Sequence, residues 1–163
     1  MLVFSPLVRE RMLADARQTF PDECCGFLFG TEKEDGSRYL SDIVVVTNAK
    51  EGDKRRRFEI APKDYLAAEQ YAEERGLMLL GVYHSHPNHP AVPSEHDRLA
   101  AQPFFSYVII SVLDGRIGRV RSWRLNDARQ FEEESIAEPL PIEDKATHAP
   151  FVAVDNPAHP STC

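Results

Sequence analysis

A nearly unbroken apolar run at residues 77–83, Leu-Met-Leu-Leu-Gly-Val-Tyr, constrains the fold more than any other segment. A strand with one face in solvent alternates apolar and polar residues, whereas a continuous apolar run of this length is typical of a strand buried on both faces. Such a strand lies inside a sheet and needs cover on each side. We therefore predict that residues 77–83 form the central strand of a layered fold.

The segments on either side of this strand supply further strands and helices. Strand patterns cover residues 25–31, 39–47, 105–113 and 117–125, and helical patterns cover residues 6–19, 62–76 and 94–101. Turn residues Asp35-Gly36 and Asp114-Gly115 join two strand pairs, and residues 84–93 form a proline-punctuated connection. The predicted fold class is α/β, a mixed β-sheet flanked by helices.

The chain has 163 residues, a length that suits one ordinary domain. Its composition changes near the end, because five of the twelve prolines fall in the last 25 residues, among acidic residues and with little periodicity. We predict one domain over residues 1–138 and a Pro-rich, loosely ordered tail over residues 139–163.

The net charge of −7 argues against binding to nucleic acid, because neutralising phosphates requires a net basic surface. The local exception is the basic run Lys54, Arg55, Arg56 and Arg57. This run has two interpretations, a solvated loop or a docking site for an acidic partner, and both stay open.

The sequence has no apolar stretch as long as a membrane span, and no basic and apolar leader at its start. Its three cysteines include the adjacent pair Cys24 and Cys25, which is poor geometry for a disulfide framework. We therefore expect no membrane partner and a cytoplasmic location. Neither cysteine is assigned a catalytic role, because Cys-x-x-Cys is absent and strand alternation would place one of them in the core.

Four of the six histidines gather between residues 84 and 96. On an extended strand, residues i and i+2 point to the same side, so His84 and His86 can direct two imidazoles at one point. Asp97, in the first turn of the helix predicted from residue 94, offers a third ligand. Two histidines and one carboxylate leave a fourth metal position open for water, which is the arrangement of catalytic rather than structural zinc sites.

Each of these residues also has a purely structural explanation. Ser94 and Asp97 have the spacing of a capping box at a helix start, and an isolated His-x-His pair is a weak indication of metal binding. Glu23 alone would be interpreted as a solvated residue at the mouth of a strand. His89 and His96 lie close to the pattern without belonging to it, and we expect both at the exposed surface.

Together, these residues closely resemble the motif of the JAMM (MPN-plus) zinc metallopeptidase family. The motif is His-x-His-Pro, seven residues and Ser-x-x-Asp, and this chain has the same spacing from His84-Ser85-His86-Pro87 to Ser94-x-x-Asp97. The family's upstream Glu-x-Cys-Gly-x-Leu-x-Gly is similar to Glu23-Cys24-Cys25-Gly26-Phe27-Leu28-Phe29-Gly30. The resemblance spans roughly residues 1–125 and includes Arg57-Phe58-Glu59-Ile60.

The resemblance implies a JAMM/MPN domain of cytidine-deaminase-like architecture that binds one zinc ion. It implies that His84, His86 and Asp97 are the metal ligands, that Glu23 is the general base and that Ser94 steadies the oxyanion. The implied reaction is hydrolysis of an amide bond by zinc-activated water.

The compact chain looks like the bacterial single-domain branch of this family, whose members act on ubiquitin-like sulfur-carrier proteins. That branch implies cleavage after the carrier's C-terminal Gly-Gly, in a carrier-cysteine adduct or a carrier precursor. Two other hypotheses stay open, a peptidase acting on other substrates such as cell-wall peptides and a non-catalytic MPN scaffold without metal. A homodimer is compatible with the fold.

Overall fold

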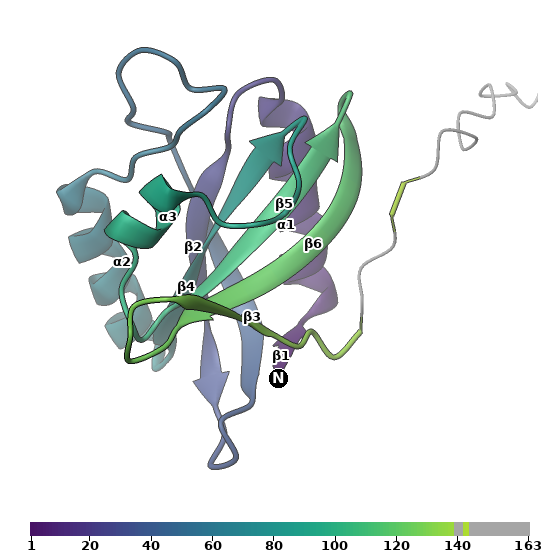
Figure 1. Cartoon of the computed structure of the whole chain (residues 1–163). Helices are drawn as coiled ribbons and strands as arrows, with labels where there is room; N and C mark the ends of the chain where they lie inside the picture. The colour runs from purple at the N-terminus through teal and green to yellow at the C-terminus, as the bar shows by residue number, and fades with distance from the viewer. Residues whose placement is uncertain (139–141, 144–163) are drawn as a thin grey trace, which may run out of the picture.

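The computed structural model describes residues 1–138, 142 and 143, which form a seven-stranded mixed sheet with helices on both sides (Figure 1). In chain order the elements are β1 (Leu2–Phe4), α1 (Pro6–Thr19), β2 (Cys25–Glu32), β3 (Arg38–Val46), α2 (Pro62–Arg75), β4 (Met78–Pro87), α3 (Glu95–Ala100), β5 (Ser106–Leu113), β6 (Arg116–Leu125) and β7 (Phe131–Glu134). The predicted fold class is confirmed. The tail predicted over residues 139–163 lies, apart from residues 142 and 143, outside the described residues.

The sheet has the strand order β1-β3-β2-β4-β5-β6-β7, so β4 lies in its middle, as the apolar run predicted. β4 pairs antiparallel with β2 and parallel with β5, and its residues 80–87 are all buried. The strand continues to Pro87, so the assignment of residues 84–87 to a connecting segment was wrong. The apolar pattern ends before His84, but backbone pairing continues, with Cys25 opposite His84 and Ser111 beside His86.

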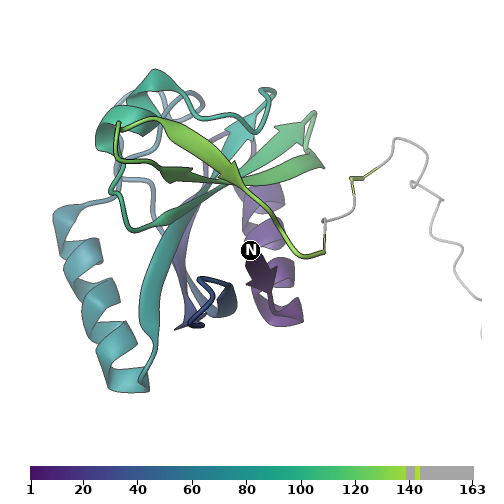
Figure 2. The same cartoon turned by 60° about the horizontal axis from the view of Figure 1, so that its bottom comes forward.

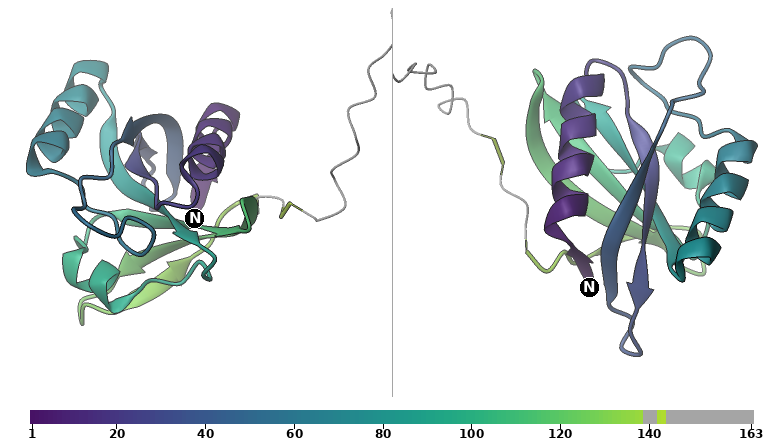
Figure 3. Two further views of the ribbon diagram at one scale, coloured as in Figure 1. Left: turned by 90° about the horizontal axis from the view of Figure 1, so that it is seen from above. Right: turned by 180° about the vertical axis from the view of Figure 1, so that it is seen from behind.

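Helices cover both faces of the sheet, as Figures 2 and 3 show. On one face α1 packs through Val8, Met12, Leu13 and Ala16. On the other face α2 packs through the small side chains of Ala68 and Ala72. A fully buried Met side chain contributes about 2 kcal/mol of transfer free energy, so burial of Met12 helps α1 to stabilise the sheet. Within the described part of the chain, no helix combines the length and apolar content needed to cross a membrane.

Most element boundaries follow local chemistry that the sequence displays. The Ser5 hydroxyl oxygen accepts a hydrogen bond from the Val8 N–H at 3.2 Å and caps α1. The turn predicted at Asp114-Gly115 has positive φ at both residues, as a two-residue hairpin turn requires. Only the short strands β1 and β7 were not predicted, because three or four residues are too few for alternation to be recognised.

A close contact between β2 and β4 fixes the end of the sheet that carries the histidines. A Cβ atom on Gly26 would lie 2.3 Å from the Tyr83 ring, so only glycine fits there. Beyond this contact, the Cys24 N–H donates to the Ser85 hydroxyl at 2.8 Å, and the Ser85 N–H donates to the Cys24 carbonyl at 3.2 Å. The segment that leads into β2 is thereby held next to His84.

Candidate metal centre

Two imidazoles meet at the end of β4. His84 and His86 are separated by one residue on a strand, so both side chains project from the same face, the one that α2 covers. Both are buried, and their Nε2 atoms lie 3.1 Å apart. The predicted convergence of these two side chains is confirmed.

The carboxylate of Asp97 completes the cluster from α3. The Ser94 N–H donates to Asp97 Oδ2 at 2.9 Å, and the Asp97 N–H donates to the Ser94 hydroxyl oxygen at 3.1 Å, which is a complete capping box. The same Oδ2 lies 3.4 Å from His84 Nε2 and 3.3 Å from His86 Nε2. The capping box and the metal-ligand interpretation are therefore compatible, because the cap orients the carboxylate towards the imidazoles.

The spacing of the three donor atoms suits a tetrahedral ion. Ligands bound at about 2.0–2.1 Å in tetrahedral geometry lie about 3.3 Å from one another, close to the separations of 3.1, 3.3 and 3.4 Å found here. His86 Nδ1 lies 2.8 Å from the Pro90 carbonyl. A carbonyl can only accept, so Nδ1 carries the hydrogen and Nε2 keeps a lone pair for a ligand bond. The cluster of His84, His86 and Asp97 is thus compatible with a metal site.

The electrostatics of the cluster favour a bound cation. Burial alone would raise the pKa of Asp97, but His84, His86 and the Ser94 N–H together hold that pKa far below its ordinary value. Burial lowers the pKa of His84 despite the opposing charge of Asp97. Burial also acts to lower the pKa of His86, but its hydrogen bonds with Asp97 and Pro90 outweigh this and raise it. Asp97 is therefore charged and His84 neutral, the states in which these two groups bind metal, whereas binding through His86 would displace the proton that its raised pKa favours.

Glu23 lies just before β2 and is only 5% exposed. Burial raises the pKa of its carboxyl to about 8, while a nearby positive charge on His86 acts to lower it and the charge on Asp97 acts to raise it. The Glu23 N–H donates to the Lys54 carbonyl at 2.7 Å, and the Glu23 carbonyl accepts from Asn48 Nδ2 at 3.2 Å. The fold therefore holds Glu23 firmly, within electrostatic range of the cluster.

A cavity of about 410 Å³ opens beside the cluster. His84 and Asp97 form part of its wall, together with the aromatic side chains of Phe58, Tyr65 and Tyr107. Phe58 stacks on His84, with ring centroids 4.4 Å apart and an interplanar angle of 24°. Sequence reasoning missed this aromatic wall as part of the site, although the segment that contains Phe58 belongs to the family resemblance.

Two secondary expectations need correction. His96 is half-buried and lines the cavity, so its assignment to the exposed surface was wrong, whereas His89 is exposed as predicted.

Cys24 and Cys25 are both buried, one in the core on each face of the sheet, where a single buried cysteine was expected. Burial raises the pKa of both thiols, which agrees with the expectation that neither is a nucleophile.

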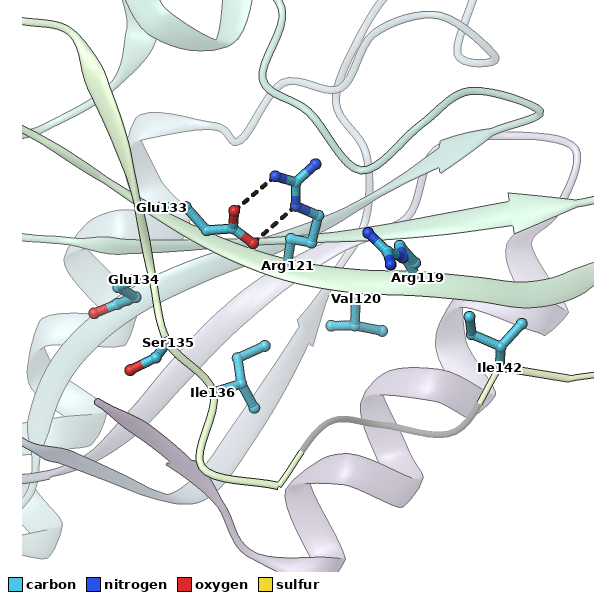
Figure 4. A pocket seen from close by; sticks show the side chains of 8 residues that line it. All are labelled: Arg119, Val120, Arg121, Glu133, Glu134, Ser135, Ile136 and Ile142. Carbon is cyan, nitrogen blue, oxygen red and sulfur yellow. Dashed lines mark hydrogen bonds and ion pairs between the residues drawn. The ribbon is translucent and has the colours of Figure 1, made fainter.

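A larger hollow of about 540 Å³ lies away from these residues, along β6, β7 and the segment that follows (Figure 4). Its wall includes Arg121, which forms two hydrogen bonds with Glu133 at 2.8 and 2.6 Å. None of the site residues predicted from the sequence lines this hollow. The larger volume of this hollow therefore does not mark it as the candidate functional site.

The sequence of this chain is similar to those of a known protein family. The family described as prokaryotic homologs of the JAB domain matches residues 6–126. The CysO-cysteine peptidase of Mycobacterium tuberculosis is 33% identical over 123 residues, which cover 75% of this chain and 81% of the relative. The desampylase of Haloferax volcanii is 31% identical over 134 residues, which cover 79% of this chain and 90% of the relative.

Two solved structures are also similar to this chain. A protein from Desulfitobacterium hafniense, with a structure determined in solution, superposes with a TM-score of 0.73 at 33% identity. The match covers 83% of this chain and 91% of that protein. A Salinibacter ruber protein gives a TM-score of 0.64 at 37% identity, over 86% of this chain and 95% of its own. At these identities the likeness extends to sequence as well as fold.

Proposed function

Because the chain belongs to the prokaryotic JAB-domain family, we propose that it is a zinc metallopeptidase that hydrolyses an amide bond. The observation that carries the proposal is the convergence of two imidazole nitrogens and one carboxylate oxygen beside a buried glutamate. Relatives named CysO-cysteine peptidase and desampylase support a hydrolytic function.

One Zn²⁺ is the proposed ion, with His84, His86 and Asp97 as its ligands. The donor set supports this choice, because catalytic zinc sites use three nitrogen or oxygen ligands from the protein and keep a fourth position free. When bound, the ion would lower the pKa of a water molecule towards neutrality and polarise the substrate carbonyl. His86 is oriented for this role by its Nδ1 hydrogen bond to the Pro90 carbonyl.

Glu23 is the proposed general base. A carboxylate beside the attacking water takes one of its protons and later gives that proton to the leaving amine. In the metal-free protein burial raises the pKa of this carboxyl to about 8, and a bound cation would lower it towards the range in which a carboxyl both accepts and releases a proton near neutral pH. The two backbone hydrogen bonds of Glu23 keep its position fixed during this transfer.

Ser94 is the proposed oxyanion donor. Its hydroxyl oxygen already accepts the N–H of Asp97 at 3.1 Å, which leaves the hydroxyl hydrogen free to donate. A donor beside the substrate carbonyl stabilises the negative charge that develops on oxygen when water adds. Ser94 would therefore have two roles, capping α3 and assisting the reaction.

The proposed substrate is a ubiquitin-like sulfur-carrier protein in the cytoplasm, cleaved after its C-terminal Gly-Gly as a carrier-cysteine adduct or a precursor. The names of the two relatives support a small carrier-type substrate. The aromatic wall of Phe58, Tyr65 and Tyr107 lies beside the cluster, and glycine residues can approach such a wall more closely than residues with side chains. An extended Gly-Gly tail therefore suits this cavity.

The proposal is tested by zinc quantification together with hydrolysis of a carrier whose Gly-Gly terminus is joined to cysteine. We expect about one zinc ion per chain and release of cysteine. Glu23→Gln should keep the zinc and lose hydrolysis. A folded preparation without zinc would argue for the scaffold hypothesis, and cleavage of generic peptides but not of carrier adducts would overturn the proposed substrate.

A further inference from the structure

The loop between β3 and α2 carries the only run of adjacent cations in the sequence, Lys54, Arg55, Arg56 and Arg57. These four residues, the basic loop, belong to a chain whose net charge is −7. In Figure 1 the β3–α2 connection projects from the top of the molecule, beyond α3. Positive charge is thus concentrated on one projecting part of an otherwise acidic protein.

The backbone of the basic loop is held in place by hydrogen bonds. The Lys54 carbonyl accepts the Glu23 N–H at 2.7 Å, and the Arg57 carbonyl accepts from Asn48 Nδ2 at 3.1 Å. Between these points, the Arg55 N–H donates to Asp53 Oδ1 at 3.0 Å. The cations are therefore presented on a fixed framework, which lowers the entropy cost of forming ion pairs with a partner.

The arginine side chains of the basic loop are directed to solvent. Arg55, Arg56 and Arg57 are exposed, and among the described residues their one ion pair joins Arg56 to Asp53 at 3.7 Å. Both members of this pair are more than half exposed, so it stabilises the fold little. Glu51, Asp53 and Glu59 offset part of the charge locally but leave the loop net positive.

The basic loop is directly connected to the candidate metal centre. Its next residue, Phe58, stacks on His84, and its Lys54 carbonyl is bonded to Glu23. A protein whose C-terminal tail occupies the cavity beside His84 would therefore bring its folded body close to this loop. An acidic body would be repelled by the net charge of −7 and attracted to the basic loop, which orients the encounter.

We infer that the basic loop is the docking site for an acidic face of the protein substrate, an inference that rests on the proposed function. The loop would contribute to recognition of the folded carrier and not to bond cleavage. Charge reversal in the loop should therefore weaken binding of a folded carrier without affecting a short substrate that contains only the tail.

The test compares two substrates, a folded acidic ubiquitin-like carrier with Gly-Gly joined to cysteine, and the last six residues of the same carrier joined to cysteine. We expect Arg55→Glu with Arg56→Glu to raise KM for the folded carrier about tenfold while kcat stays unchanged, an effect that diminishes as salt increases. Hydrolysis of the short substrate should not change.

A matched double reversal, Lys33→Glu with Arg75→Glu, lies in the β2–β3 turn and at the C-terminal end of α2. It changes the net charge equally and should leave KM near the wild-type value. An unchanged KM in the loop variant, or an equal loss on the short substrate, would overturn docking while the proposed function stands. Failure of the wild-type protein to cleave the folded carrier would instead overturn the proposed function, and docking with it.

Discussion

The side-chain amide of Asn48 donates a hydrogen bond to the backbone carbonyl of Glu23, 3.2 Å away. The same amide donates to the Arg57 carbonyl at 3.1 Å, and the Asn48 side-chain oxygen accepts the N–H groups of Lys50 and Glu59, both at 3.0 Å. Asn48 is buried, so all of its hydrogen-bonding capacity is used inside the protein. It joins the proposed general base to the loop that leads to Phe58.

Asn48→Ala should therefore lower both stability and turnover. Loss of four hydrogen bonds at a buried position is expected to cost about 2 kcal/mol in the free energy of unfolding, measured by denaturant titration. Because Glu23 would lose one of its two backbone tethers, kcat should fall about tenfold. Asp35→Ala removes a side-chain hydrogen bond from the distant β2–β3 turn and should leave kcat unchanged. A normal kcat in Asn48→Ala would show that the tether does not position Glu23.

Asp97→Asn should weaken zinc binding without unfolding the chain. An amide oxygen keeps the size of the side chain and its acceptor towards Ser94, but it lacks the negative charge that favours a cation. We expect zinc affinity to fall by at least about tenfold, measured by competition with a chelating dye. His89→Ala removes an exposed histidine from the following loop and should retain normal zinc binding. Equal affinity in Asp97→Asn would remove Asp97 from the ligand set.

The cluster of His84, His86 and Asp97 could be predicted because its geometry is encoded over a short stretch of sequence. His84 and His86 share one face of a strand, and Asp97 follows in the next element. Local periodicity and capping rules therefore place all three donors. Glu23 could be predicted only through the family resemblance, because the contact between Cys24 and Ser85 that brings it to the site joins distant segments of the chain.

The remaining features depend on tertiary contacts that leave no local pattern. Asn48 looks like an ordinary loop residue until its partners on both sides are known, and Tyr107 looks like a strand residue of the core. The end of β4 was placed too early because His84 and His86 break the apolar run, although the fold buries both, with exposures of 1% and 8%. Because these polar residues interrupt the apolar pattern, the pattern underestimates the length of the strand.

Glu23→Gln should stabilise the metal-free protein at alkaline pH. The folded-state pKa of Glu23, about 8, lies above its ordinary value of 4.5. The folded protein therefore binds this proton more tightly than the unfolded chain, and its stability decreases as pH rises from about 4.5 to about 8. Glutamine has no such proton, so the variant should be more stable than wild type by about 4 kcal/mol at pH 8 and similar to it at pH 4. Thermal unfolding of both proteins in the presence of a chelator, at pH 4 and at pH 8, measures this difference in stability.

The matched control for this variant is Glu59→Gln, which removes the charge of an exposed glutamate in the neighbouring loop. Its stability should follow that of wild type at both pH values. If Glu23→Gln also followed wild type at pH 8, the carboxyl of Glu23 would not be held in a buried, proton-binding state.

Substitutions of Ser94 separate its capping role from its proposed role in the reaction. Ser94→Ala removes both the acceptor for the Asp97 N–H and the free hydroxyl, so α3 should lose about 1 kcal/mol of capping stability and kcat should fall about a hundredfold. Ser94→Asp keeps a side-chain acceptor for the cap but has no hydroxyl, so kcat should stay low while the cap is restored. Ser94→Thr keeps both functions and should recover most of the turnover. If Ser94→Asp were as active as wild type, with zinc content unchanged, capping of α3 would be the only role of Ser94.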